Sequence, residues 1–192
     1  MRDDEDGPLG DKIAGAELKR GDDSILTIPY LVDATAHSGL LGKIMQLGSS
    51  TTYIQGPLLW EEPRGAITAL SQLLTEFFDL FRVANLQRWN SGRNGRFATD
   101  VGASALIRLL ADLITFMVTK DHQDPRELHP KISIERVERY AEPCIRYFKT
   151  APDDALEKRF YVPFGETEYH FVREFAVAAF IEGRWFVRSR IA

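Results

Sequence analysis

Arginine, asparagine and aromatic side chains are concentrated in residues 88–97, which read Arg-Trp-Asn-Ser-Gly-Arg-Asn-Gly-Arg-Phe. A guanidinium group binds phosphate through paired hydrogen bonds, and an aromatic ring stacks on a nucleic-acid base. This stretch therefore suggests a nucleic-acid-binding loop. Its candidate contact residues are Arg88, Trp89, Arg93, Asn94 and Arg96.

The same stretch has a purely structural interpretation. Two glycines and two asparagines interrupt helical structure, so residues 88–97 would form the loop between two helices. Trp89 and Phe97 would then anchor the adjoining helix ends in the core, with the arginines in solvent or paired with carboxylates. The net charge of −4 favours this interpretation, because nucleic-acid-binding domains are usually basic. Any nucleic-acid binding is therefore expected to be weak.

A second group of reactive side chains lies at Asp121, His122, Asp124 and His129. Carboxylate and imidazole groups bind several divalent metals, so residues 121–129 define a metal-dependent hydrolase as an alternative function. Two prolines mark this stretch as a loop, and it has no pair of histidines four residues apart on a helix. A solvated loop is the favoured interpretation, and we assign no catalytic residue and no metal ligand.

The chain lacks the compact motifs that identify common enzyme classes. It has no P-loop, dinucleotide fingerprint, nucleophile elbow or zinc-protease motif. The single cysteine, Cys144, excludes an internal disulfide and a cysteine-rich zinc site. It lies on an apolar helical stripe, where we expect it to be buried and inert. We therefore expect a protein without a cofactor that is not an enzyme.

The sequence indicates a protein of the cytoplasm. A single cysteine fits a reducing compartment. The first residues are acidic, which is unlike a signal peptide. The most apolar run, residues 101–118, carries Arg108 and Asp112, whereas a membrane span needs about 20 mostly apolar residues.

The elements that would position the loop at 88–97 are helices. Apolar residues recur at helical spacing from Pro63 to Trp89, which predicts a central helix of roughly 40 Å at about 1.5 Å per residue. Leu73 and Leu80 add a second apolar stripe, so two faces require burial. The main stripe consists of Ile67, Leu70, Leu74, Phe77, Phe78, Phe81 and Ala84.

Further helices are expected on both sides of this one. Thr99 or Asp100 can cap a helix that continues to Met117, and Ser133 can cap another that continues to Phe148. Pro143 lies inside the second, which predicts either a kink or two abutting helices. Near the start of the chain, Thr27, Pro29 and Gly39 mark the beginning, first turn and end of a short helix, and His37 would cap its C-terminal end. Residues 40–47 would add a further helical turn, followed by a polar loop at residues 49–52.

The fold class predicted from these elements is mainly α, in one domain. Residues 24–192 would form the helical domain, with at most one small β element near the C-terminus, from residues 160–164 and 185–187. Residues 1–23 are acidic and are expected to be partly mobile, with a short docked segment at 8–13.

Five segments follow one another in a characteristic order: Pro8–Ile13, Ile25–Val32, a helix before Trp89-Asn90, the helix Gly102–Leu110 and Phe164-Gly165-Glu166. This order resembles the DGQHR-domain proteins, bacterial proteins that include a regulator-like member of DNA phosphorothioation gene sets. The Asp-Gly-Gln-His-Arg signature itself is absent, so the resemblance is to the C-terminal helical half and it transfers no catalytic residue. It implies regulation or defence linked to DNA.

The first functional hypothesis is therefore a non-enzymatic regulatory or protein-interaction module in a bacterial DNA-modification or defence setting. Such a module would bind a protein partner or form a homo-oligomer, and it should expose an apolar patch or a dimer interface. Nucleic-acid binding through residues 88–97 is the second hypothesis, and the hydrolase is the third.

Overall fold

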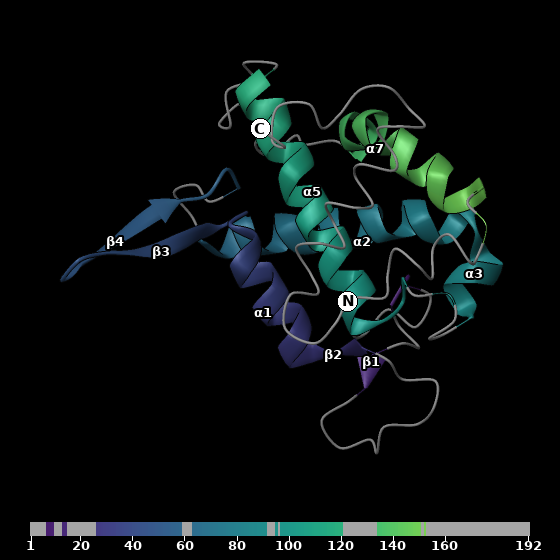
Figure 1. Ribbon diagram of the computed structural model, residues 1–192, viewed down its shortest axis with the longest axis horizontal. Helices are drawn as coiled ribbons and strands as arrows, with labels where there is room; N and C mark the ends of the chain where they lie inside the picture. The colour runs from purple at the N-terminus through teal and green to yellow at the C-terminus, as the bar shows by residue number, and fades with distance from the viewer. Residues whose placement is uncertain are drawn as a thin grey trace.

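The computed structural model of the protein describes residues 7–9, 13–14, 26–58, 63–91, 95, 97–120, 134–150 and 152. Helices predominate among them, which confirms the predicted mainly α fold class (Figure 1). The helices are α1 (Ile28–Ser38), α2 (Pro63–Ala84), α3 (Leu86–Asn90), α5 (Asp100–Lys120) and α7 (Ile134–Thr150). The strands are β1 (Ile13–Ala14), β2 (Leu26–Thr27), β3 (Gly42–Leu47) and β4 (Ser50–Gln55).

The helices pack around one apolar core. Helix α5 lies against α1 and α7, and α7 also lies against α2. Figure 1 shows α5 crossing α2, with α7 and α3 toward one end of α2 and the β3–β4 hairpin projecting beyond the other. The core therefore sits between α2, α5 and α7.

Helix α2 shows the buried stripe that its spacing predicts, with two corrections. Leu73 is buried and Leu80 is partly buried, so the second stripe also faces protein. Ile67 is 58% exposed, because it lies on the solvent face of the helix with hydroxyl-bearing side chains. The helix ends at Ala84, well before Trp89, because Asn85 leaves helical geometry (φ −153°, ψ 81°) and its side chain caps α3.

Helix α5 is the most deeply buried helix of the described chain. None of its side chains between residues 102 and 117 is exposed, as expected for a largely apolar helix that packs against both α1 and α7. Thr99 caps it, since the Gly102 amide donates to Thr99 Oγ1 at 3.1 Å. Asp100 has a different role, because its Oδ1 accepts from the Thr27 amide at 2.7 Å and so ties α5 to β2.

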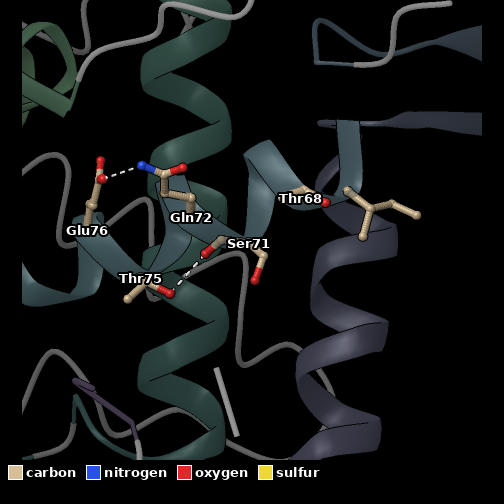
Figure 2. A pocket seen from close by; sticks show the side chains of 6 residues that line it. Thr68, Ser71, Gln72, Thr75 and Glu76 are labelled. Carbon is tan, nitrogen blue, oxygen red and sulfur yellow. Dashed lines mark hydrogen bonds between the residues drawn. The ribbon is translucent and has the colours of Figure 1, made fainter. Parts of the chain in front are cut away.

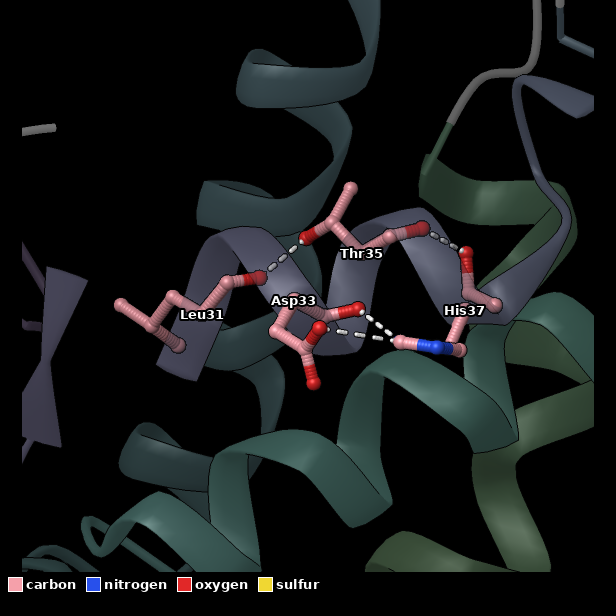
Figure 3. Close-up of polar contacts among 5 residues, drawn as sticks. Leu31, Asp33, Thr35 and His37 are labelled. Atoms are coloured by element: carbon pink, nitrogen blue, oxygen red, sulfur yellow. Dashed lines mark hydrogen bonds and ion pairs between the residues drawn. The ribbon is translucent and has the colours of Figure 1, made fainter. Parts of the chain in front are cut away.

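Helix α1 begins and ends where the sequence predicts. Gly39 ends it in the left-handed conformation, with φ 75°. The Thr27 hydroxyl does not cap the helix and instead lies 3.4 Å from Asp100 Oδ1. In the last turn, His37 Nδ1 lies 2.9 Å from the Asp33 carbonyl oxygen and 3.2 Å from its carboxylate (Figure 3). His37 is therefore held within α1, at the end where a cation is favourable.

The β3–β4 hairpin corrects the prediction for residues 40–52. The segment expected to form a helical turn and a polar loop forms two antiparallel strands, with Leu47 opposite Ser50. Gly48, at φ 63°, supplies the positive φ of the two-residue turn between them. Thr, Tyr and Ile in β4 favour extended structure. The predicted C-terminal β element, residues 160–164 and 185–187, lies outside the described residues.

Part of the acidic N-terminal region is held against the helical body. Leu9 is buried, and the carbonyl of Pro8 accepts a hydrogen bond of 3.0 Å from Trp89 Nε1. Further along, Ile13 pairs with Leu26 in a short parallel ladder. The remainder of residues 1–23 lies outside the described part of the chain.

Helix α7 runs through Pro143 as one element, which excludes the second of the two predicted alternatives, two abutting helices. The predicted apolar stripe of α7 is confirmed. Its predicted cap, Ser133, lies outside the residues that the structure describes. The buried side chains are Val137, Ala141, Pro143, Cys144, Tyr147 and Phe148.

Cys144 should be unreactive in the folded protein. Burial, and secondarily the charge of Glu142, raise the pKa of its thiol from 9.0 to about 12. We expect thiol reagents at pH 8 to modify it only as fast as the protein unfolds, measured by absorbance with a disulfide reagent. Between about pH 9 and pH 12 the unfolded state loses a proton that the native state keeps. The free energy of unfolding should therefore fall, by at most about 1.4 kcal/mol per pH unit.

The variant Cys144→Ala provides the control for this pH dependence. Its unfolding free energy should lack the part of the alkaline decline that the thiol causes, so the difference between wild type and variant isolates that part. Rapid modification of the native thiol at pH 8 would contradict its burial.

Candidate interaction site

The structure describes only two of the five residues that were predicted to contact nucleic acid, Arg88 and Trp89. Arg93, Asn94 and Arg96 lie outside the described residues. The guanidinium of Arg88 donates to the Phe148 carbonyl near the end of α7 and lies 5.6 Å from the Phe148 ring centroid. A cation is favourable at the carbonyl end of a helix and over an aromatic face. Arg88 therefore joins α3 to α7.

Trp89 is placed in the core and not on a surface. It is 1% exposed, and its ring lies 6.4 Å from that of Phe78. Neither ring face is accessible, which argues against the predicted stacking of Trp89 on a base. Phe97 is also fully buried, with its ring centroid 4.0 Å from that of Phe148. Both aromatic side chains therefore lie in the core, as the structural interpretation of residues 88–97 predicted.

Gly95 brings the chain back toward the end of α3. A Cβ atom at this position would overlap the carbonyl oxygen of Arg88. Nearby, the Ser91 amide donates to that same carbonyl at 3.2 Å, and the Phe97 amide donates to Gly95 at 2.9 Å. This close backbone approach lets Phe97 enter the core two residues later.

The residues of the hydrolase alternative, Asp121 to His129, lie outside the described part of the chain. Among the residues that the structure describes, no three His, Cys, Asp or Glu side chains come together as a metal site. Within the same residues, no helix combines the length and apolar character needed to cross a bilayer.

The β3–β4 hairpin presents a group of neighbouring apolar side chains to solvent, whereas the other large exposed apolar residues of the described chain lie on helices. Ile44 is 72% exposed and Tyr53 is 54% exposed, and the two residues are direct cross-strand partners on one face. Ile54 is 41% exposed on the opposite face, where Lys43 is its partner. Every residue of β4 is exposed. Figure 1 shows the hairpin extending away from the helices, in agreement with the exposed side chains on both of its faces.

The base of the hairpin is held against the helices, whereas the rest of the hairpin extends into solvent. The Gly56 amide donates to Leu41 at 3.1 Å, and the Leu58 amide donates to Leu40 at 2.9 Å. Leu40 and Leu58 are buried in the core. A side chain at Gly56 would overlap backbone atoms of residues 39, 40 and 42. The hairpin is therefore presented in a defined direction.

A shallow hollow runs along the exposed face of α2 (Figure 2). Its polar groups bond within the helix: Thr75 Oγ1 donates to the Ser71 carbonyl at 2.9 Å, and Gln72 Nε2 donates to Glu76 Oε1 at 2.9 Å. These bonds use the hydroxyl proton of Thr75 and one amide hydrogen of Gln72, and the hollow is open along a solvent-facing helix. The hollow is less suited to a specific site than the hairpin.

Ile44, Tyr53 and Ile54 were not singled out from the sequence. A signal was present, because residues 42–55 hold a single charge, Lys43, around a turn at Gly48. Comparison of the chain with protein-family models, with curated proteins and with solved structures gives no match.

Proposed function

We propose that this chain is a non-enzymatic protein-interaction module whose contact element is the β3–β4 hairpin. The observation that carries this proposal is the cross-strand pair Ile44 and Tyr53, which is largely exposed on an arm with a fixed base. Neighbouring exposed apolar side chains are one of the features found at protein-interaction sites.

The low intrinsic stability of a two-stranded hairpin supports the proposal. A two-stranded ribbon is only marginally stable in water, because it has too few neighbours to bury its side chains. A partner that covers Ile44 and Tyr53, or that adds a strand, would stabilise it. Strand addition supplies affinity through main-chain hydrogen bonds and specificity through alternate side chains.

The biological setting of the proposal is regulatory, in bacterial DNA modification or defence. This part rests on the resemblance carried by residues 8–13 and 25–32. The nucleic-acid alternative has less support, since Trp89 is buried and Arg88 contacts Phe148. The other three candidates, Arg93, Asn94 and Arg96, lie outside the described residues.

The test compares two substitutions at equally exposed apolar residues. Ile44→Lys places a charge on the hairpin, and Val83→Lys places the same charge on α2, where Val83 is 70% exposed. Both should fold, because substitutions at exposed positions usually change stability by less than about 0.5 kcal/mol. Wild type and both variants are immobilised and exposed to host extract. Retained proteins are identified and then titrated as purified pairs.

We expect a partner that binds wild type and Val83→Lys alike, and Ile44→Lys at least about tenfold more weakly, which corresponds to about 1.4 kcal/mol. A differently tagged copy of the chain is included among the proteins titrated. Equal binding to all three proteins, or no binding to any, would reject the hairpin as a contact element.

A further inference from the structure

We infer that the hairpin's partner is a second copy of this chain, which pairs through the outer edge of β4 to make a four-stranded antiparallel sheet. This inference rests on the proposed function and names the partner for it. It follows from the chemistry of the β4 edge, from the distribution of charge and from the symmetry of strand pairing.

Strand β4 has an edge without the usual protection. Edge strands of monomeric proteins generally carry charges, proline or a bulge, which prevent pairing with another chain. Residues 50–55, Ser-Thr-Thr-Tyr-Ile-Gln, contain no charge and no proline, and all six are exposed. Within the described residues β4 pairs with β3 alone. A neutral six-residue segment with a strong extended preference is a template for another strand.

The edge of β3 is less suited to this role. It carries the charged side chain of Lys43, and α1 lies against β3 near its base. Gly42 is covered by the Tyr53 ring, whose hydroxyl donates to the Leu41 carbonyl at 2.8 Å. Pairing is therefore expected at β4.

The charge distribution favours a copy of the chain over a charged partner. Lys43 is the only charged residue between 42 and 55, and the chain as a whole carries −4. A polyanion would find no basic surface on the hairpin. A neutral strand with hydroxyl and apolar side chains would fit, and β4 is itself such a strand. Two copies of β4 would also approach without charge repulsion at the edge.

Symmetry restricts the register of this pairing. An antiparallel strand that pairs with its own copy has a two-fold axis perpendicular to the sheet, so one residue must lie opposite itself. The centre of β4 lies between Thr52 and Tyr53, so one of these two is the self-paired residue. With Thr52 at the axis, Thr51 of each copy faces Tyr53 of the other. Aromatic and β-branched residues form favourable cross-strand pairs.

The size of the contact sets its expected strength. Each copy contributes the six residues of β4, whereas standard interfaces use about 20–30 residues on each side. Contacts of this size belong to weak, transient complexes. The dimer should accordingly dissociate on dilution.

The test is cysteine scanning along the hairpin. Directly opposed residues in an antiparallel pair have Cα atoms about 4.5–5.5 Å apart, within the range of a disulfide. Thr52→Cys and Tyr53→Cys are oxidised mildly, with Gln46→Cys on β3 as an equally exposed control. The native Cys144 is buried and does not compete. We expect a disulfide-linked dimer from one β4 variant and little from the control.

Sedimentation of the reduced protein provides the second measurement. Wild type should shift from monomer to dimer as its concentration rises. Thr52→Lys should raise the dissociation constant of the dimer at least about tenfold. Gln46→Lys places the same charge on β3 but keeps Ile44, the apolar cross-strand partner of Tyr53, and should behave as wild type. Crosslinking that is strongest at Gln46→Cys would overturn the choice of edge.

Monomer at every concentration, with no crosslink at residue 52 or 53, would overturn the inference. That result is separate from a failure of the proposed function. If Ile44→Lys still abolishes binding of another protein, the hairpin remains a contact element and only the identity of its partner changes.

Discussion

Phe81→Ala should lower the free energy of unfolding by about 3–5 kcal/mol, the usual cost of truncating a buried phenylalanine. Phe81 is fully buried, and its ring centroid lies 5.4 Å from that of Phe77, 6.0 Å from Phe97 and 5.9 Å from Phe148. These neighbours belong to α2, to the segment before α5 and to α7. Removing the ring therefore leaves a cavity where three parts of the core meet, and rigid helices cannot close it.

Urea denaturation followed by circular dichroism measures this loss. Val83→Ala is the matched control, because Val83 lies two residues away in the same helix and is 70% exposed. Its unfolding free energy should change by less than about 0.5 kcal/mol. A loss below about 1 kcal/mol for Phe81→Ala would show that the three parts do not share one core.

Gly95→Ala should cost about 3 kcal/mol, the upper end of the usual penalty for inserting a methyl group into packed structure. The added Cβ would overlap the Arg88 carbonyl oxygen, which is backbone and cannot rotate away. The segment after α3 would have to move outward, and Phe97 would be displaced from its contact with Phe148. The loss combines steric strain with the loss of aromatic packing.

Thermal and urea unfolding of Gly95→Ala measure this effect, with Gly48→Ala as the control. A Cβ at Gly48 meets nothing within 4 Å, but its φ of 63° is unfavourable for alanine. That substitution should cost about 1–2 kcal/mol, confined to the hairpin turn. Wild-type stability in Gly95→Ala would contradict the close approach of Gly95 to the Arg88 carbonyl.

The principal helices were predictable because each places apolar residues on a protein-facing stripe. The spacing of Leu70, Leu74, Phe77 and Phe81 produces α2, and Gly39 marks the end of α1. The hairpin was not predictable in this way, because solvent lies on both of its faces. Its strands need no alternation of apolar and polar residues, and the usual period of two is absent. The break at Asn85 was missed because it depends on a side-chain cap, within a stripe that otherwise continues.

The prominence of residues 88–97 in the sequence has a related explanation. Residues 88–97 draw attention through arginine and tryptophan, but the chemistry of Trp89 serves the core, where its indole bonds to Pro8. Ile44 and Tyr53 are residues of ordinary chemistry that attract attention only because they are exposed. Exposure depends on where the tertiary structure places a segment, and the local sequence does not encode it.

The long-range bonds of the N-terminal segment have a consequence for synthesis on the ribosome. The Thr27 amide binds Asp100, 73 residues later, and the Pro8 carbonyl binds Trp89, 81 residues later. At about 5–20 residues per second, these partners emerge roughly 4–16 s after the groups that they bind. During this time Leu9 and Leu26 have no core in which to be buried. The hairpin can already form, because its contacts are local. Nascent chains stalled before residue 89 should bind a chaperone through the N-terminal segment.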